Sequence, residues 1–281
     1  MTGIWSLLLL FLSYIAGRAA IPAGREFLFT HGVHAPNYRG ERIPTSFGGY
    51  LVLLLTGLSL LNFAVIRFLP LFSQSLLLAS LFASVGVAFL GWLDDTLGSH
   101  QDRGFRGHFR SMLREGRLTT GVLKAAGGGI TAAVAAVVTA GSGMEWVIHT
   151  LFIALMTNWL NLLDLRPGRC LKFYLAGGIL LYIVGFFAPN TPVFVPLLGL
   201  AAAIFRLDLA GRLMLGDSGA NLLGLQLGMW AAVVLPFWLT GVLTILLGIG
   251  HYLSETVSLT RIIESNRWLS YLDGLGRRGV K

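Results

Sequence analysis

Two adjacent carboxylates, Asp94 and Asp95, close an apolar run of about twenty residues, the length that crosses a bilayer. Neighbouring carboxylates repel each other, and at a helix C-terminus both oppose the negative end of the macrodipole. A divalent cation offsets both penalties, because Mg²⁺ binds one or two carboxylates and completes its shell with substrate phosphate oxygens. Solvated charges at a helix end are the alternative interpretation. A further source of compensating charge is the following loop, with Arg103, Arg106, Arg110, Arg114 and Arg117.

A second polar group ends another apolar run. In "NWLNLLD", Asn158, Asn161 and Asp164 are spaced three residues apart and therefore share one side of a helix. Amides and carboxylates inside an apolar run are costly unless they face a bundle interior or a wet cavity. Hydrogen bonds between helices explain the two Asn residues equally well. The carboxylate of Asp164 favours a functional interpretation, since at this depth it requires a cation or a donor.

A third group precedes a further apolar run. In "GDSG", Asp217 lies between glycines, and either Asp217 or Ser218 could cap the following helix. The functional alternative is a backbone that closely approaches a phosphate at a helix N-terminus. Lys124, one turn into yet another run, supplies a cation. These groups together fit metal-assisted phosphoryl transfer to a lipid phosphate. The carboxylates would bind Mg²⁺, the lysine would bind phosphates, the amides would bind a polar ligand, and the membrane would hold the lipid.

The elements that carry these groups are predicted to be membrane helices. The chain is 55% hydrophobic and 12% charged, with a mean hydropathy of +0.73, which excludes an ordinary soluble domain. We expect an all-α polytopic integral membrane bundle of about nine transmembrane helices over 1–253, and a cytoplasmic amphipathic tail over 254–281. Pro196 is expected to kink or tilt the short seventh span. The spans are predicted at roughly 4–22, 47–66, 71–93, 119–140, 144–163, 172–188, 193–206, 219–235 and 237–253.

Basic residues predict the orientation. Lys and Arg cluster in the loops 18–46, 94–118, 164–172 and 206–218 and in the tail, whereas Arg67 is the only basic residue of the alternate loops. The positive-inside tendency then predicts an external N-terminus and a cytoplasmic C-terminus. The net charge of +8 is explained by this distribution, so we expect no nucleic-acid partner.

The tail allows two interpretations. Its apolar residues recur at helical spacing with basic residues between them, which is typical of a helix lying on a membrane surface. Alternatively, the tail covers the site and contributes Arg261, Asn266 or Arg267 to it. The sequence slightly favours surface anchoring.

Taken in order, "IPTSFGG", "GWLDDTLG", "NWLNLLD" and "LMLGDSGANLLG" resemble motifs of the polyprenyl-phosphate N-acetylhexosamine-1-phosphate transferase superfamily. The resemblance covers about 44–224. It implies Mg²⁺-dependent transfer of a sugar-1-phosphate from a UDP-sugar to undecaprenyl phosphate, with release of UMP. It also implies a multi-pass protein of the bacterial cell membrane, an active site at the cytoplasmic face and a possible homodimer.

The resemblance also implies roles for individual residues. Asp217 would be the main metal ligand, while Asp94 and Asp95 would handle the acceptor phosphate or help to hold the metal, Asp95 as the second ligand. Substrate binding would fall to Thr45 of the first loop, to Lys124 as a phosphate contact, to Asn158, Asn161 and Asp164 at the nucleotide, and to Arg212.

The sequence departs from the family at several positions. The second Asp of a family motif is replaced by Pro167 in "DLRPGR", and Arg212 replaces a lysine. The His-rich loop of the family has no counterpart, and nine spans replace the usual ten or eleven. The only histidine in the tail region, His251, is expected to be buried in a helix end.

These departures leave other functions open. A catalytically degenerate member would bind prenyl phosphate or scaffold envelope-synthesis partners, and would explain the missing histidines. A transporter is a weaker alternative, because no charged residue lies near the middle of a span. The closely spaced Asp motif of CDP-alcohol phosphotransferases is absent from the sequence.

Overall fold

The computed structural model of the chain describes residues 1–69, 71–98 and 120–277. The five loop arginines between 103 and 117, proposed above as compensating charges, lie outside the described residues. The helices and strands in chain order are α1 (Thr2–Thr30), β1 (His34–Pro36), β2 (Arg42–Pro44), α2 (Gly48–Phe68), α3 (Gln74–Leu97), α5 (Thr120–Val137), α6 (Gly143–Leu163), α7 (Arg169–Val184), η1 (Thr191–Val193), α8 (Val195–Leu209), α9 (Gly216–Val234), α10 (Phe237–Thr256), α11 (Leu259–Ser265) and α12 (Arg267–Gly274).

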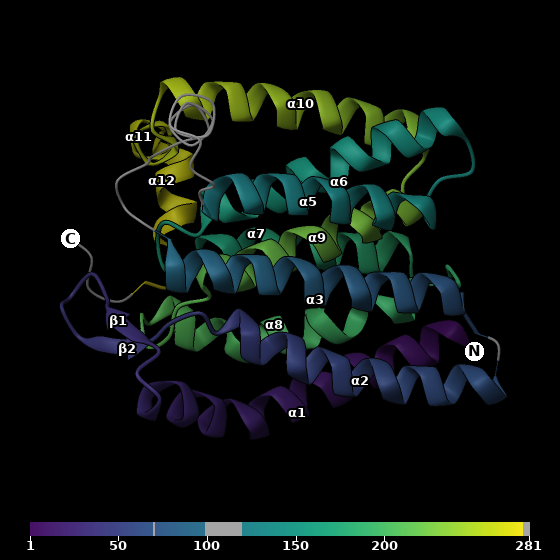
Figure 1. Cartoon of the computed structure of the whole chain (residues 1–281), viewed down its shortest axis with the longest axis horizontal. Helices are drawn as coiled ribbons and strands as arrows, with labels where there is room; N and C mark the ends of the chain where they lie inside the picture. The colour runs from purple at the N-terminus through teal and green to yellow at the C-terminus, as the bar shows by residue number, and fades with distance from the viewer. Residues whose placement is uncertain (70, 99–119, 278–281) are drawn as a thin grey trace.

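The fold is a bundle of long helices, as the sequence predicts. Within the described residues, the helices α1, α2, α3, α5, α6 and α10 are long and apolar enough to cross a membrane. The chain is therefore built as a multi-pass membrane protein. The other predicted spans coincide with α7, α8 and α9, of which α7 and α8 are only 16 and 15 residues long. Figure 1 shows the long helices running side by side, with α1 and α10 on opposite sides.

Helix α9 lies at the centre of the bundle, which explains its more polar sequence. Its residues are buried without interruption from Ser218 to Ala232, and it packs against α3 and α6 (Figure 1). A helix surrounded by protein can carry polar groups that find partners there. The Gln226 amide nitrogen, for example, donates to Ser80 Oγ (2.7 Å) and Ser84 Oγ (2.6 Å) on α3.

Two helices that contain proline differ from the sequence prediction. The first helix does not end near residue 22: it continues through Pro22 to Thr30, and Gly24 remains buried beyond the proline. Pro196 does not kink a span either. It lies in the first turn of α8, directly after η1, where the missing N–H costs no helical hydrogen bond.

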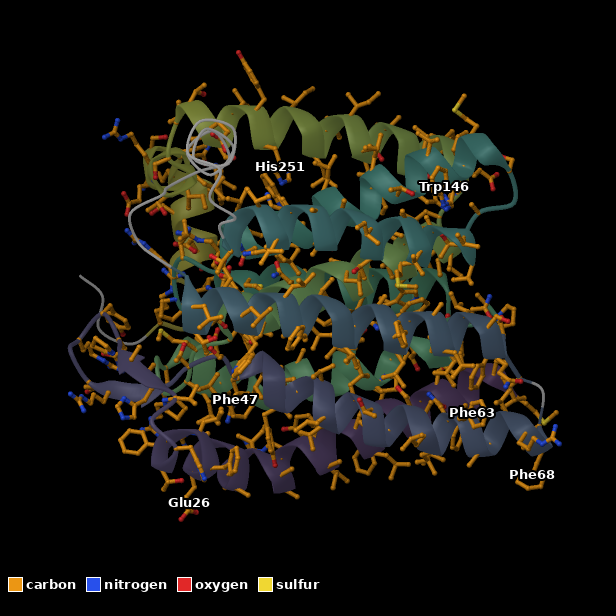
Figure 2. The ribbon with its side chains drawn as sticks, in the orientation of Figure 1. Glu26, Phe47, Phe63, Phe68, Trp146 and His251 are labelled. Atoms are coloured by element: carbon orange, nitrogen blue, oxygen red, sulfur yellow. The ribbon has the colours of Figure 1, made fainter. Side chains whose placement is uncertain are left out.

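All the carboxylates of interest lie at one end of the bundle, which we call the polar end and define by Asp94, Asp95 and Asp217. In Figure 1 the hairpin β1–β2 and the short helices α11 and α12 lie at this end. Figure 2 shows Glu26 and Phe47 at the polar end, and Phe68 and Trp146 at the opposite end.

Backbones approach one another closely at the polar end. The hairpin continues into a short backbone ladder with the segment that precedes α9: Met214 N donates to the Pro44 carbonyl (2.8 Å), and Gly48 N donates to the Leu215 carbonyl (3.1 Å). A methyl group on Gly48 would overlap the backbone of Gly219. Glycine at position 48 therefore brings α2 against the start of α9.

We expect Gly48→Ala to lower the free energy of unfolding by about 1–3 kcal/mol, because the added methyl group overpacks a backbone contact. The matched control is Gly57→Ala on the same helix, where an added Cβ meets nothing within 4 Å. The control should stabilise the helix by about 0.5–1 kcal/mol. Unfolding of the purified protein in detergent measures both, and equal midpoints for the two variants would disprove the close packing.

Candidate active site

The two adjacent aspartates have different roles. Asp95 caps the N-terminus of α9 from the neighbouring helix: its Oδ1 accepts from Asp217 N (2.9 Å) and its Oδ2 from Ser218 N (3.3 Å). Neither Asp217 nor Ser218 caps the helix with its own side chain. The carboxylate of Asp95 thus satisfies two of the amide groups that a helix start leaves unpaired, and its charge complements the positive end of the dipole.

Glycines allow this contact between α3 and α9. Gly216 has a φ of +69°, and a Cβ there would lie 2.5 Å from the Asp95 Oδ2. A Cβ on Gly91, one turn before the aspartates, would lie 2.5 Å from the carbonyl carbon of Asp217. The glycines of "GWLDD" and "GDSG" therefore permit the approach of two backbones, a role that the single sequence did not reveal for Gly91.

Asp94 points to a different partner, Lys124 of α5. The ammonium of Lys124 lies 3.4 Å from Asp94 Oδ2 and also forms an ion pair with Asp217 Oδ2. The three side chains come from α3, α5 and α9 and are 17–31% exposed. One cation therefore joins two carboxylates that are 123 residues apart in the sequence, and the residues predicted to act together do meet.

Asn161 of α6 completes this cluster. With its amide oriented to satisfy both neighbours, its nitrogen donates to Asp217 Oδ1 (2.9 Å) and its oxygen accepts from Lys124 Nζ (2.8 Å). Four helices thus contribute to one polar network. We call Asp94, Lys124, Asn161 and Asp217 the acidic cluster.

A cavity of about 610 Å³ opens beside the acidic cluster, between α3, α5, α6, α9 and α10. Asp94, Lys124 and Asn161 line it, whereas Asp217 reaches the cavity only through its contacts with Lys124 and Asn161. Asn158 lines the cavity one turn deeper along α6. Much of the remaining wall is apolar and includes Val87, Leu90, Ala154 and Leu155. The cavity therefore suits a molecule with a charged end and an apolar part.

His251 also lines this cavity, and it is partly buried near the end of α10. Its side chain extends from α10 toward the cavity side of the bundle in Figure 2. Nδ1 lies 2.8 Å from the Leu247 carbonyl, which can only accept, so Nδ1 donates this hydrogen bond. Nε2 is buried and has no hydrogen-bond partner among the described residues. A polar group of a ligand in the cavity would give this buried nitrogen a partner.

Asp164 lies close to the acidic cluster but does not line the cavity. It follows the last residue of α6, and no side-chain hydrogen bond or ion pair is formed by it within the described part of the chain. Burial raises the pKa of Asp164 well above its usual range, and the charges of Asp208, Asp217 and Asp95 raise it further. A carboxyl group in such surroundings holds a proton unless a cation is near.

Thr45 and Arg212 lie apart from the acidic cluster. Thr45 is half-buried, and its backbone N–H donates to the Val33 carbonyl (3.2 Å). Its neighbour Ser46, with a φ of +52°, is the residue that packs against Gly216. Arg212 is exposed and lines a separate groove beside Arg25 and Arg42. The structure therefore does not bring these two predicted substrate-binding residues to the cavity.

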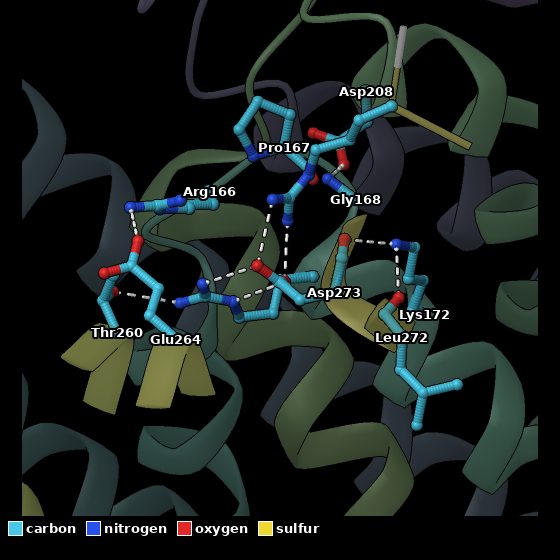
Figure 3. A network of polar contacts seen from close by, with 11 residues as sticks. Arg166, Pro167, Gly168, Lys172, Asp208, Thr260, Glu264, Leu272 and Asp273 are labelled. Carbon is cyan, nitrogen blue, oxygen red and sulfur yellow. Dashed lines mark hydrogen bonds and ion pairs between the residues drawn. The ribbon is translucent and has the colours of Figure 1, made fainter. Parts of the chain in front are cut away.

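The C-terminal helices are fixed to the connection between α6 and α7 (Figure 3). Asp273 of α12 accepts four hydrogen bonds of 2.8–3.0 Å from the guanidinium groups of Arg169 and Arg277. The Arg277 Nε also donates to the Pro167 carbonyl (2.7 Å), and Lys172 Nζ donates to the carbonyls of Leu272 and Asp273. The position where this chain departs from the family motif, Pro167, is thus part of the contact with the tail.

Among its described residues, the tail contributes Ser254 and Glu255 to the wall of the cavity. Arg261, Asn266 and Arg267 are exposed, and Asn266 uses its side chain to cap α12 by accepting from Trp268 N and Leu269 N. The last cavity-lining residue is Glu255, before α11 begins. Trp268 is 78% exposed, which agrees with a membrane-surface position for one side of α12. The described part of the tail is therefore attached to the bundle by specific contacts, and its position on a membrane surface stays a prediction.

The donor set is chemically suited to Mg²⁺. Among the described residues, no group of three or more His, Cys, Asp or Glu side chains is arranged to hold a metal ion. Mg²⁺ requires only one or two protein carboxylates when substrate phosphates complete its shell. Asp94 and Asp217 face a common point, since both contact Lys124 Nζ, whereas both oxygens of Asp95 accept backbone N–H groups. If the site holds Mg²⁺, Asp94 is therefore better placed than Asp95 to share it with Asp217.

No protein-family model and no curated protein matches the chain. The family resemblance therefore stays a prediction from the order of the motifs in the sequence.

Proposed function

We propose that this protein is a Mg²⁺-dependent transferase that moves a sugar-1-phosphate from a UDP-sugar to undecaprenyl or another polyprenyl phosphate. The product would initiate a cell-envelope glycopolymer. In this proposal the polar end faces the cytoplasm of a bacterial cell, since the basic segments 18–46, 164–172 and 206–218 of the described chain end or turn there.

A single observation carries the proposal: three separate motifs deliver Asp94, Asn161 and Asp217, and α5 delivers Lys124, to one network beside a cavity of the helix bundle. A purely structural role for each motif gives no reason for the three to meet. The combination of carboxylates, a lysine and amides also supplies the groups that phosphoryl transfer uses, which are metal ligands, a phosphate-binding cation and polar contacts for a nucleotide.

The residues of this chain would divide the work as follows. Lys124 would bind a phosphate oxygen and neutralise charge that develops during transfer. Asn158 and Asn161 would orient the donor by hydrogen bonds, and His251 Nε2 would accept one from a hydroxyl or amide of the sugar. Asp94 and Asp217 would hold Mg²⁺, which when bound supplies positive charge at the diphosphate. An oxygen of the lipid phosphate forms the new P–O bond while the bond to UMP breaks.

The direct test is UMP release by the purified protein. We expect release only when undecaprenyl phosphate, Mg²⁺ and the correct UDP-sugar are all present, with a loss of turnover when EDTA removes the metal. A panel of UDP-sugars identifies the donor, and radiolabelled sugar recovered in the lipid phase shows transfer rather than hydrolysis. Absence of UMP release with every donor, from protein that is folded in detergent, would reject an active transferase.

One observation favours the alternative, a degenerate member that binds prenyl phosphate without turnover. Lys124 already neutralises part of the charge of Asp94 and Asp217, so the described cluster is compensated without a metal. A prenyl-phosphate binder would show saturable, Mg²⁺-independent binding of the lipid and no UMP release. The transferase instead predicts that Mg²⁺ and donor change the affinity for the lipid phosphate.

A further inference from the structure

A second concave site lies at the polar end, away from the acidic cluster. It is a groove of about 370 Å³ between the end of α1, strand β2 and the segment before α9. Arg25, Arg42 and Arg212 line it, and none of its lining residues belongs to the larger cavity. Three arginines from distant parts of the sequence therefore converge on one groove.

The charge of these arginines is not balanced within the described residues. None of the three guanidinium groups forms an ion pair or a side-chain hydrogen bond there. The Arg25 Nε is buried and has no partner. Glu26, the only acidic residue lining the groove, is exposed and forms no ion pair with them in the described structure. The groove thus carries a formal charge of +2, from three arginines and one glutamate.

Unpaired donors in a groove favour a specific class of ligand. A guanidinium presents a planar fork of N–H groups that matches phosphate oxygens, and charge-assisted hydrogen bonds of this kind are the stronger ones. A buried N–H without a partner costs free energy that an acceptor from a ligand would recover. Thr30, at the rim of the groove, adds a hydroxyl group.

The position of the groove is suited to the membrane surface. It adjoins the last turns of α1, where Phe27 and Phe29 are 56% and 45% exposed. Basic pockets at the cytoplasmic ends of membrane helices bind anionic headgroups, and adjacent exposed aromatic residues suit the lipid interface.

We propose that Arg25, Arg42 and Arg212 form a binding site for a phosphate-bearing anion, either the phosphodiester headgroup of an anionic phospholipid or a free phosphate. The site is separate from the cavity and does not depend on the proposed transferase reaction. It also gives Arg212 a role that its distance from the acidic cluster otherwise leaves without explanation.

The experiment is a binding titration of the purified full chain in a neutral detergent. The probes are short-chain phosphatidylglycerol, short-chain phosphatidylcholine and inorganic phosphate, measured by calorimetry. We expect each of Arg25→Gln, Arg42→Gln and Arg212→Gln to weaken anion binding about tenfold, the loss of one charge-assisted contact, and the triple variant to abolish it. Arg25→Lys keeps the charge but loses the fork and should fall between wild type and Arg25→Gln.

The matched control is Arg206→Gln, an exposed arginine near the C-terminal end of α8 that does not line the groove. If the protein binds phosphatidylglycerol but not phosphatidylcholine, the groove is a site for an anionic headgroup. If it binds inorganic phosphate, and phosphate competes with phosphatidylglycerol, the groove accepts free phosphate. Either result supports the site when the triple variant loses it. Unchanged anion binding in the triple variant, no anion binding by wild type, or an equal loss in Arg206→Gln would overturn the proposal.

Discussion

Asp217→Asn is expected to lower turnover about 1,000-fold, the upper range for removing one group that stabilises charge in a transition state. Asn is nearly isosteric with Asp, so Lys124 keeps an oxygen to which it can donate. The substitution removes the negative charge that a bound Mg²⁺ requires from its ligand. The loss should appear in kcat and in the Mg²⁺ dependence of UMP release, while the protein remains monodisperse in detergent.

The control for this variant removes a carboxylate elsewhere. Glu145→Gln takes one negative charge from the first turn of α6, at the opposite end of the bundle from Asn161. It should leave the rate of UMP release within about twofold of wild type, since Glu145 is one helix length from the acidic cluster. Normal turnover of Asp217→Asn at saturating Mg²⁺ would show that the metal assignment is wrong.

The meeting of the acidic residues could be predicted from the sequence, but the division of their roles could not. Their positions at helix ends, with polar residues on one face of an apolar run, indicated a common polar end. Asp94 and Asp95 are adjacent, however, and point about one hundred degrees apart on a helix. Which of them meets Lys124 and which caps α9 depends on the helix rotation that Gly91 and Gly216 permit. That rotation is a property of packing between helices rather than of either segment.

Helix boundaries and distant pairings were the less predictable part. The predicted span ends near residue 22, whereas α1 continues to Thr30, where Gly24 is buried and Leu28 packs against the core. The resemblance of the segment around Asp217 to a family motif predicted that Arg212 binds substrate. The left-handed glycines Gly211 and Gly216 turn the intervening chain, so that Arg212 faces the groove with Arg25 instead. Short sequence separation did not imply a shared site.

Asp273→Ala is expected to release the C-terminal helices at neutral pH. The side chains of Arg169, Asp273 and Arg277 are only 6–9% exposed, and removal of the single carboxylate leaves two buried guanidinium groups facing each other. Removing one partner of a buried charge network costs about 3–5 kcal/mol, but a tail that detaches lets both arginines return to water. The loss of stability is therefore limited to the free energy with which the tail docks on the bundle. Limited trypsin digestion measures the release of the tail as faster cleavage at Arg261 and Arg267.

The pH dependence of wild type follows from the same carboxylate. Burial alone would raise the pKa of Asp273, but the hydrogen bonds and charges of Arg169 and Arg277 outweigh burial and hold the pKa well below its usual range. The stabilisation is therefore complete above the unfolded pKa of about 3.9 and is lost only as the pH falls through the lower folded value. Tail protection should stay constant from pH 8 to about pH 5 in wild type.

Glu264→Gln on α11 is the matched control, because Glu264 forms an exposed ion pair with Arg166 on the same connection between α6 and α7. An exposed pair contributes about 0–1 kcal/mol, so trypsin sensitivity should change little. If Asp273→Ala and Glu264→Gln digest at the same rate as wild type, the buried network does not hold the tail. Asp273→Ala could also release the tail without changing the rate of UMP release. That result would show that the proposed reaction does not depend on the attachment of the tail, because Asn161 and Asp164 would then keep their positions without α12.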